Sequence, residues 1–228
     1  MSRDFFGLYE PADAVKDLNE GRDAKEVFAS LAEWMKIRSE WADDIRPTFK
    51  MLHEHKMPTE LLKAWLDSHE TGGLLVDICE YNRDEWESIG IKAEDFIDKY
   101  LARYGEQFFE NFHLDDLPEI VTMEKLLDFY KIKDILGFTK SYGFCEFLGE
   151  YKACGGKIEA VADKFFKEIG YDPQWREAII DLIEAGAPVD FEKFVSSLSP
   201  DDIRDYYYDT LERAGASREV LERVAINN

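Results

Sequence analysis

Apolar side chains recur at the spacing of an α-helix along almost the whole chain, and this feature constrains the fold most. Between residues 24 and 45 they follow the i, i+3, i+4, i+7 pattern, which places one apolar stripe on one side of a helix. The stripe consists of Val27, Phe28, Leu31, Trp34, Met35, Ile37, Trp41 and Ile45. Because every such stripe needs an apolar partner, a chain built of these segments folds by packing helices together.

Gly, Pro and Ser mark the ends of further helical segments. We expect Pro47 to kink or break the first segment, and a short helix that opens at Pro58 to end at the Gly72-Gly73 pair. The run 74–81, LLVDICEY, suits a strand but also fits one helical face, and we favour helix. Later helices are predicted over 96–104 with an end at Gly105, over 124–136, 178–183, 191–198 and 219–225, and from a Ser-Pro-Asp-Asp start at 199–202.

These segments predict an all-α protein: a multi-helix globule of short antiparallel helices with little or no sheet. Two interpretations stay open, because Trp41, Trp86, Tyr130 and Trp175 follow one another at a period near 45 residues. That period is typical of helical solenoid repeats, although four of many aromatic residues can fall on such a grid by chance.

A polar, acidic stretch at 111–119, NFHLDDLPE, follows a predicted helix and contains a proline. It is either an ordinary loop or a junction between two helical subdomains. If it is a junction, the subdomains are residues 1–112 and 113–228. If it is only a loop, the two parts form one continuous domain.

The charge balance narrows the class of partner. The chain has 228 residues with 28 basic and 49 acidic side chains, so its formal net charge is −21. Direct binding of DNA, RNA or anionic lipid needs clustered Lys and Arg, and here acid outnumbers base throughout. We therefore expect no direct nucleic-acid or membrane contact and a basic protein as partner.

Motifs for catalysis, cofactors and metals are lacking in the sequence. The Gly-Gly pairs at 72–73 and 155–156 lie in no phosphate-binding frame, and no GxSxG elbow is present. His53 and His55 are two residues apart and so point to different sides of a helix, which does not suit one metal ion. We expect no enzyme, no cofactor and no metal site.

The cysteines and the N-terminal sequence indicate the compartment. Cys79, Cys145 and Cys154 form no CxxC pair and suit reduced, half-buried thiols. No apolar run is long enough to span a bilayer, and the first residues, MSRDFFGLYEPADAV, do not resemble a signal peptide. We expect a cytoplasmic protein, in the host cytoplasm if a phage encodes it.

Acidic residues gather in several dense groups that are candidates for partner binding. Carboxylates about 5–6 Å apart on a rigid helix approximate the spacing of phosphates along a duplex. Asp201 and Asp202 are explained by helix capping alone. The candidate residues are Asp43, Asp44, Asp84, Glu85, Glu87, Glu94, Asp95, Asp98, Asp115, Asp116, Asp205 and Asp209, with Tyr208 as an aromatic residue among acids.

Our first hypothesis is an acidic inhibitor that binds the basic nucleic-acid-binding surface of a partner. In size, acidity and helical character the chain resembles phage antirestriction and anti-CRISPR inhibitors, which include DNA mimics, and bacterial immunity proteins that neutralise nucleases. Electrostatic steering would make association of such an inhibitor depend on salt. Its aromatic content also fits a homodimer.

Three alternatives stay open. The chain is a helical adaptor or scaffold that binds a protein or peptide, for which the period near 45 is the motive. Or it is an enzyme whose site is assembled from distant residues, with a cavity at His53, His69 or His113. Or the charge only keeps the protein soluble.

Overall fold

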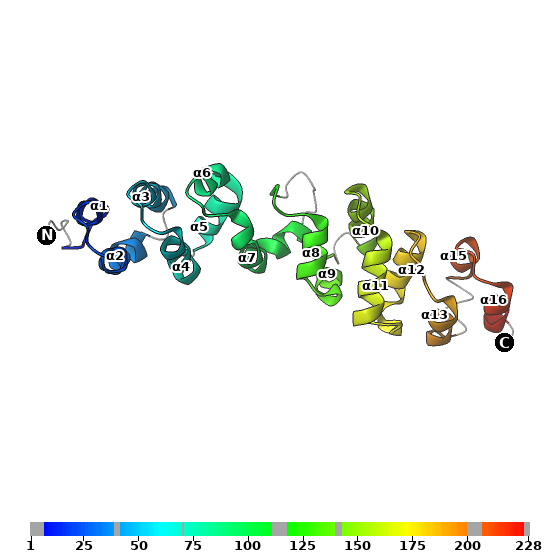
Figure 1. The fold of residues 1–228 in the computed structure, drawn as a ribbon. Coiled ribbons are helices and arrows are strands. Elements are labelled where there is room, and N and C mark those ends of the chain that lie inside the picture. Colours follow the sequence, from blue (N-terminus) through cyan, green and yellow to red (C-terminus); the bar gives the residue numbers. More distant parts are fainter. Residues whose placement is uncertain are drawn as a thin grey trace. The chain divides into compact units, whose positions relative to one another are not determined.

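Helices joined by short turns make up the chain in the computed structural model, which describes residues 7–38, 42–69, 71–110, 118–139, 143–199 and 207–225 (Figure 1). Within these residues no strand or sheet occurs, so the predicted all-α class is confirmed. The period near 45 stays a prediction, since Trp41 lies outside the described residues.

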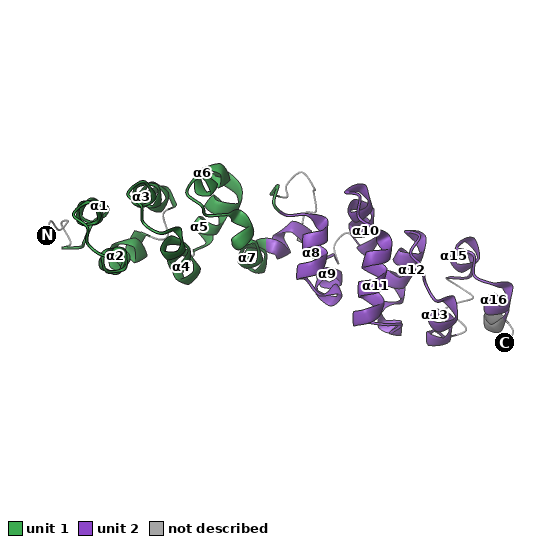
Figure 2. Cartoon of the chain, in the orientation of Figure 1, with its two compact units in different colours: residues 1–104, 118–120 green, residues 105–117, 121–228 purple. Residues whose placement is uncertain are grey.

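The chain divides into two compact units (Figure 2): residues 1–104 with 118–120, and residues 105–117 with 121–228. The subdomain boundary predicted between residues 112 and 113 lies outside the described residues and stays a prediction. Helices that lie in or begin in unit 1 are α1 (Pro11–Asn19), α2 (Ala24–Arg38), α3 (Ala42–Glu54), α4 (Thr59–His69), α5 (Gly72–Val76), the π-helix η1 (Asp77–Tyr81), α6 (Arg83–Ser88), the 3₁₀-helix η2 (Ala93–Asp95) and α7 (Ile97–Glu110). Those of unit 2 are α8 (Met123–Phe129), α9 (Ile132–Phe138), α10 (Phe144–Ala153), α11 (Ile158–Glu168), the 3₁₀-helix η5 (Pro173–Trp175), α12 (Arg176–Glu184), α13 (Phe191–Ser197), α15 (Tyr208–Arg213) and α16 (Arg218–Ala225).

The core of unit 1 is built from the apolar stripes of successive helices. α1 packs against α2 and α3, and α2 also packs against α3 and α4. Phe49 of α3 meets the rings of Trp65 and Trp86 edge to face, with centroids 5.7 and 5.5 Å apart. Such aromatic pairs stabilise a core by about 0.5–1.5 kcal/mol each beyond the burial of their area. Trp86 therefore ties α6 to the helices that precede it.

Unit 2 has an aromatic core of its own. Phe109, which is fully buried, lies with its ring centroid 5.7 Å from Tyr130, 5.4 Å from Phe138 and 6.1 Å from Phe147. These rings come from α7, the turn after α8, α9 and α10, so one cluster holds four segments together.

The segment predicted over 24–45 departs from the sequence pattern in two ways. Ile37 is 55% exposed, so its assignment to the buried stripe is wrong: it lies in the last turn of α2, whose buried residues are Val27, Leu31 and Met35. The predicted break at Pro47 is also wrong, because α3 continues through it. A proline inside a helix loses the backbone hydrogen bond to the residue four before it and crowds that residue's carbonyl, which costs about 3 kcal/mol. The burial of Ile45 and Phe49 on α3 offsets that cost.

Three glycines predicted to end helices, Gly72, Gly73 and Gly105, lie elsewhere in the helices. Gly72 and Gly73 begin α5, while α4 has already ended at His69. α7 runs through Gly105, so the predicted helix end there is wrong. Gly105 lies against the Tyr130 ring, where a Cβ atom would come within 2.7 Å of Cζ and closer still to the hydroxyl oxygen. At Gly72, against the Tyr104 hydroxyl group, and at Gly105, glycine is required by close packing rather than by a helix end.

Several other predictions are settled by the helix bounds. The run 74–81 is helical, as favoured, with Leu74, Leu75, Ile78 and Cys79 buried. The segment 124–136 is divided between α8 and α9. Of the helix start predicted at 199–202, residues 200–202 lie outside the described residues. Cys145 and Cys154 are exposed, which corrects the expectation of half-buried thiols, and all three cysteines are free.

Candidate partner-binding surface

Arg46 of α3 gathers three carboxylates from three segments of unit 1. Its guanidinium lies 2.7 Å from Asp77 of η1, 3.1 Å from Glu85 of α6 and 3.6 Å from Asp43 on its own helix. Burial lowers the pKa of Arg46, but the hydrogen bonds and charges of its acidic partners outweigh burial and raise that pKa above its ordinary value. Arg46 therefore keeps its positive charge. Because it faces three carboxylates, these four side chains together carry a net negative charge.

Asp77 is the buried centre of this group. Its side chain is 7% exposed, and both of its oxygens accept hydrogen bonds from Arg46 at 2.7 Å. The amide of Asn82 donates to it at 2.6 Å and the indole N–H of Trp86 at 2.8 Å. A buried carboxylate is tolerated only when charge and hydrogen bonds compensate its desolvation, and here they do.

Arg83 of α6 forms a second group with the same design. Glu87 lies 2.8 Å away in the next turn of α6, Glu94 of η2 lies 3.5 Å away, and Glu119 lies 3.9 Å away. The hydrogen bond to Glu87 is the main cause that raises the pKa of Arg83. We call Asp43, Glu85, Glu87, Glu94 and Glu119, which these two arginines hold, the acidic cluster of unit 1.

The structure brings some of the predicted acids together and leaves others apart. Asp43, Glu85, Glu87 and Glu94 belong to the acidic cluster, and Asp84 is exposed on α6 between Arg83 and Glu85. Asp44 pairs with Arg38, and Asp95 pairs with Lys63 of α4 at 2.7 Å. Elsewhere, Asp98 is exposed on α7, while half-buried Tyr208 and exposed Asp209 lie on α15 in unit 2; Asp115, Asp116 and Asp205 lie outside the described residues.

Sequence reasoning missed Arg46, Asp77 and Glu119, because each owes its place to tertiary contact. It also missed Tyr81, whose ring is 76% exposed. The one sequence feature that could have drawn attention to Tyr81 is the run 74–81, whose pattern suits both a strand and a helix. In the structure the α-helix changes to π geometry at Asp77 and ends one turn later at Tyr81. A π-helical turn often occurs at a functional site.

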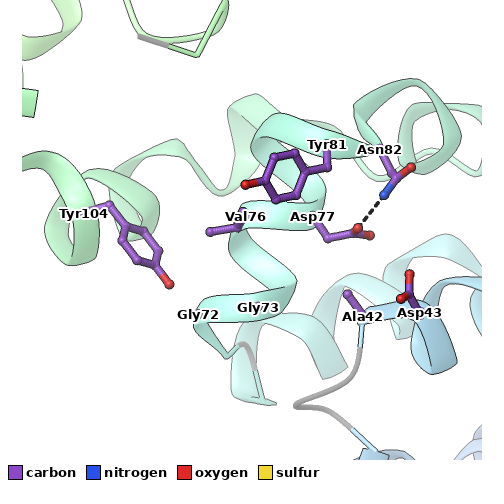
Figure 3. A pocket seen from close by; sticks show the side chains of 9 residues that line it. All are labelled: Ala42, Asp43, Gly72, Gly73, Val76, Asp77, Tyr81, Asn82 and Tyr104. Carbon is purple, nitrogen blue, oxygen red and sulfur yellow. Dashed lines mark hydrogen bonds between the residues drawn. The ribbon is translucent and has the colours of Figure 1, made fainter. Parts of the chain in front are cut away.

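A pocket of about 450 Å³ opens beside the acidic cluster. Figure 3 shows Tyr104 of α7 and Tyr81 on either side of Val76, with Asp43 on the facing end of α3. The floor includes the backbone of Gly72, which Tyr104 approaches so closely that a Cβ atom there would collide with its hydroxyl group. The pocket is lined by Ala42, Asp43, Gly72, Gly73, Val76, Asp77, Tyr81, Asn82 and Tyr104.

No known relative identifies this surface. No protein-family model, no curated protein and no solved structure matches the chain. Among the residues that the structure describes, no three His, Cys, Asp or Glu side chains are grouped to hold a metal ion. In that same part of the chain, no helix combines the length and apolar character needed to cross a lipid bilayer.

One carboxyl group in unit 2 titrates unusually. Asp181 of α12 is half-buried, and burial, followed by the charges of Glu184 and Glu177, raises its pKa from 3.8 to about 6. The Asp181 carboxylate accepts a hydrogen bond from the backbone N–H of Cys145, in the first turn of α10. Asp181 thus caps α10, the helix that packs against its own.

Replacing Asp181 with asparagine should stabilise unit 2 at pH 7.5. The folded carboxyl group holds its proton more tightly than the unfolded one, so stability falls as the pH rises from about 4 to about 6. At about 1.4 kcal/mol per pKa unit the gain is at most about 3 kcal/mol, and solvent screening reduces it to about 1 kcal/mol.

Asparagine keeps an acceptor for the Cys145 N–H, so the cap itself should survive. Urea denaturation at pH 7.5 and pH 5, with amide protection in α12 reporting on unit 2, should show the gain shrinking as the pH falls. The exposed Asp163 of α11 offers a control, since Asp163→Asn should change stability little at either pH. An Asp181→Asn gain that is equal at both pH values would contradict the assignment.

Proposed function

We propose that this protein is an inhibitory binding protein whose acidic cluster occupies the basic nucleic-acid-binding surface of a protein partner. The observation that carries the proposal is the arrangement around Arg46 and Arg83, which brings carboxylates from α3, α6, η2 and residue 119 together at one surface. Solubility alone needs only net charge and does not require acids from several segments to be grouped at one place.

Fixed carboxylates favour binding for an energetic reason. A partner's arginine or lysine that pairs with a mobile side chain must also order it, which costs about 0.5–1.5 kcal/mol for each side chain immobilised. In the acidic cluster that cost is already met on folding, because Glu85, Glu87 and Glu94 lie within 3.5 Å of a guanidinium nitrogen. Each arginine meets three carboxylates, so the surface keeps an excess of negative charge for the partner.

Tyr81 supports an interface at the same place. Tyr81 is a large aromatic residue, 76% exposed, that lines the pocket next to the acids. Tyrosine is enriched among the residues that dominate binding energy at protein interfaces. A single exposed aromatic residue needs no explanation by itself, but here it adjoins both the pocket and the acidic cluster.

The first test is capture of the partner from cell lysate by the tagged protein, repeated with excess duplex DNA and with raised salt. The proposal expects a nucleic-acid-binding protein that both competitors release. It also expects the association rate for that partner to fall at least tenfold between about 50 and 200 mM salt. A partner that neither DNA nor salt displaces would remove the proposal and favour the helical adaptor.

A charge-matched pair of variants makes the test specific to the acidic cluster. We expect the triple variant Glu85→Gln, Glu87→Gln, Glu94→Gln to weaken binding about tenfold, because it removes the cluster's excess charge. The control, Glu146→Gln, Glu159→Gln, Glu192→Gln, alters net charge equally at exposed positions of unit 2 and should change affinity less than twofold. Equal losses in both variants would show that only total charge matters.

A further inference from the structure

The pocket beside the acidic cluster has the chemistry of a cation receptor. Two of its nine lining residues, Asp43 and Asp77, are acids and none is Lys or Arg, although Arg46 pairs with both acids and the guanidinium of Arg103 lies close to Gly72. Asp77 already accepts hydrogen bonds from Arg46, Asn82 and Trp86, so its oxygens are fully engaged. Asp43 is different: its side chain is 95% exposed, and its 3.6 Å separation from Arg46 is the longest of that arginine's three ion pairs. Asp43 is therefore the carboxylate that a ligand can reach.

Two aromatic rings complete the pocket. Tyr81 leaves the end of η1 with its ring largely in solvent, and the hydrogen bond from Asn82 to Asp77 fixes the turn that follows it (Figure 3). Tyr104 comes from α7, and the guanidinium of its neighbour Arg103 lies 5.9 Å from its ring centroid. The exposed face of Tyr81 is thus the ring surface on which a second planar cation can stack.

We propose that this pocket receives an arginine side chain from the protein partner, stacked on Tyr81 and paired with Asp43. This inference rests on the proposed function, since it names the residue through which a basic surface would engage the acidic cluster. Arginine fits better than lysine because its planar guanidinium can stack on an aromatic ring while its several N–H donors pair with a carboxylate that lines the same pocket. The pocket volume is within the range of small-ligand sites and admits one such side chain.

The test uses the full chain and a short probe, the peptide acetyl-Gly-Arg-Gly-amide, followed by the amide resonances of the protein. Shifts should concentrate at Gly72, Gly73, Val76 and Tyr81. The citrulline peptide, which has the same shape but no charge, should bind at least tenfold more weakly, and the lysine peptide should also bind more weakly. Free L-arginine that bound more tightly than the peptide would overturn the assignment to a protein side chain.

Variants separate the pocket from general charge. Asp43→Asn and Tyr81→Ala should each weaken arginine-peptide binding about fivefold or more; both side chains are exposed, so the effect on folding should be small. Asp84→Asn changes the net charge equally at an exposed residue outside the pocket and should stay within twofold. Equal binding of the citrulline peptide, or equal effects of Asp43→Asn and Asp84→Asn, would overturn the inference.

The two proposals fail in different experiments. A basic partner that salt and DNA release, but whose affinity is unchanged by Asp43→Asn and Tyr81→Ala, would uphold the proposed function and overturn the arginine pocket. Selective arginine-peptide binding at the pocket, in a protein that captures no nucleic-acid-binding partner, would uphold the pocket's chemistry and remove the proposed function.

Discussion

Replacing Asp77 with alanine should lower the free energy of unfolding of unit 1 by about 3–5 kcal/mol, the cost typical of breaking a buried ion pair from one side. The substitution leaves Arg46 without its closest partner and deprives the buried indole N–H of Trp86 of its acceptor. A buried donor without an acceptor costs about 1–3 kcal/mol. Glu85 and Asp43 still face Arg46, but both are on the solvent side and compensate only part of its charge.

Urea denaturation followed by tryptophan fluorescence suits this measurement, because Trp65 and Trp86 lie in the core of unit 1. Asp77→Asn keeps an acceptor and the side-chain shape, so its cost should fall between those of alanine and wild type. Asp84→Ala, at an exposed position on α6, should cost less than about 0.5 kcal/mol. An Asp77→Ala variant that lost less than about 1 kcal/mol would show that the network contributes little to the fold.

The helices could be predicted because apolar residues within each segment recur with a period of about 3.6 residues, which is visible in the local sequence. α4 and α12 show this well: Leu62, Trp65 and Leu66 on the first, and Ile179 and Leu182 on the second, are buried as their spacing predicts. The ends of helices were predicted less well, since they depend on what lies next to the chain. Gly105 carries the same local signal whether it ends a helix or lies against an aromatic ring, and only the fold distinguishes the two.

The candidate surface was predictable in the same partial way. Burying a charge is costly, so exposure of an acidic side chain can be expected from the residue type alone. This expectation holds for Asp43, Glu85, Glu87 and Glu94. Their grouping does not, because the ion pair between Arg46 and Asp77 joins residues 31 positions apart. A carboxylate held by an arginine and one free in solvent look alike in sequence. The sequence shows how many acids the chain carries, and the structure shows which of them pair with an arginine.

Replacing Gly105 with alanine should destabilise unit 2 by about 1–3 kcal/mol, although alanine is the better helix former. Inside an exposed helix this change gains about 0.5–1 kcal/mol. At Gly105 the new Cβ atom would overlap the hydroxyl group of Tyr130 and lie 2.7 Å from Cζ. The ring cannot move aside cheaply, since Phe109 and Phe138 contact it edge to face with centroids 5.7 and 5.5 Å away. Overpacking of this kind costs more than helix propensity returns.

Gly149 provides the matched control, because it lies inside α10 of the same unit and a Cβ atom there meets nothing within 4 Å. Gly149→Ala should therefore stabilise unit 2 by the propensity gain alone. Adding Tyr130→Phe to Gly105→Ala removes the overlapping oxygen and should restore part of the loss, but not all of it, because Cζ remains close. Amide protection in α9 and α10 measures all three variants. If Gly105→Ala and Gly149→Ala were equally stabilising, Gly105 would be an ordinary helical glycine and the contact with Tyr130 would not constrain the fold.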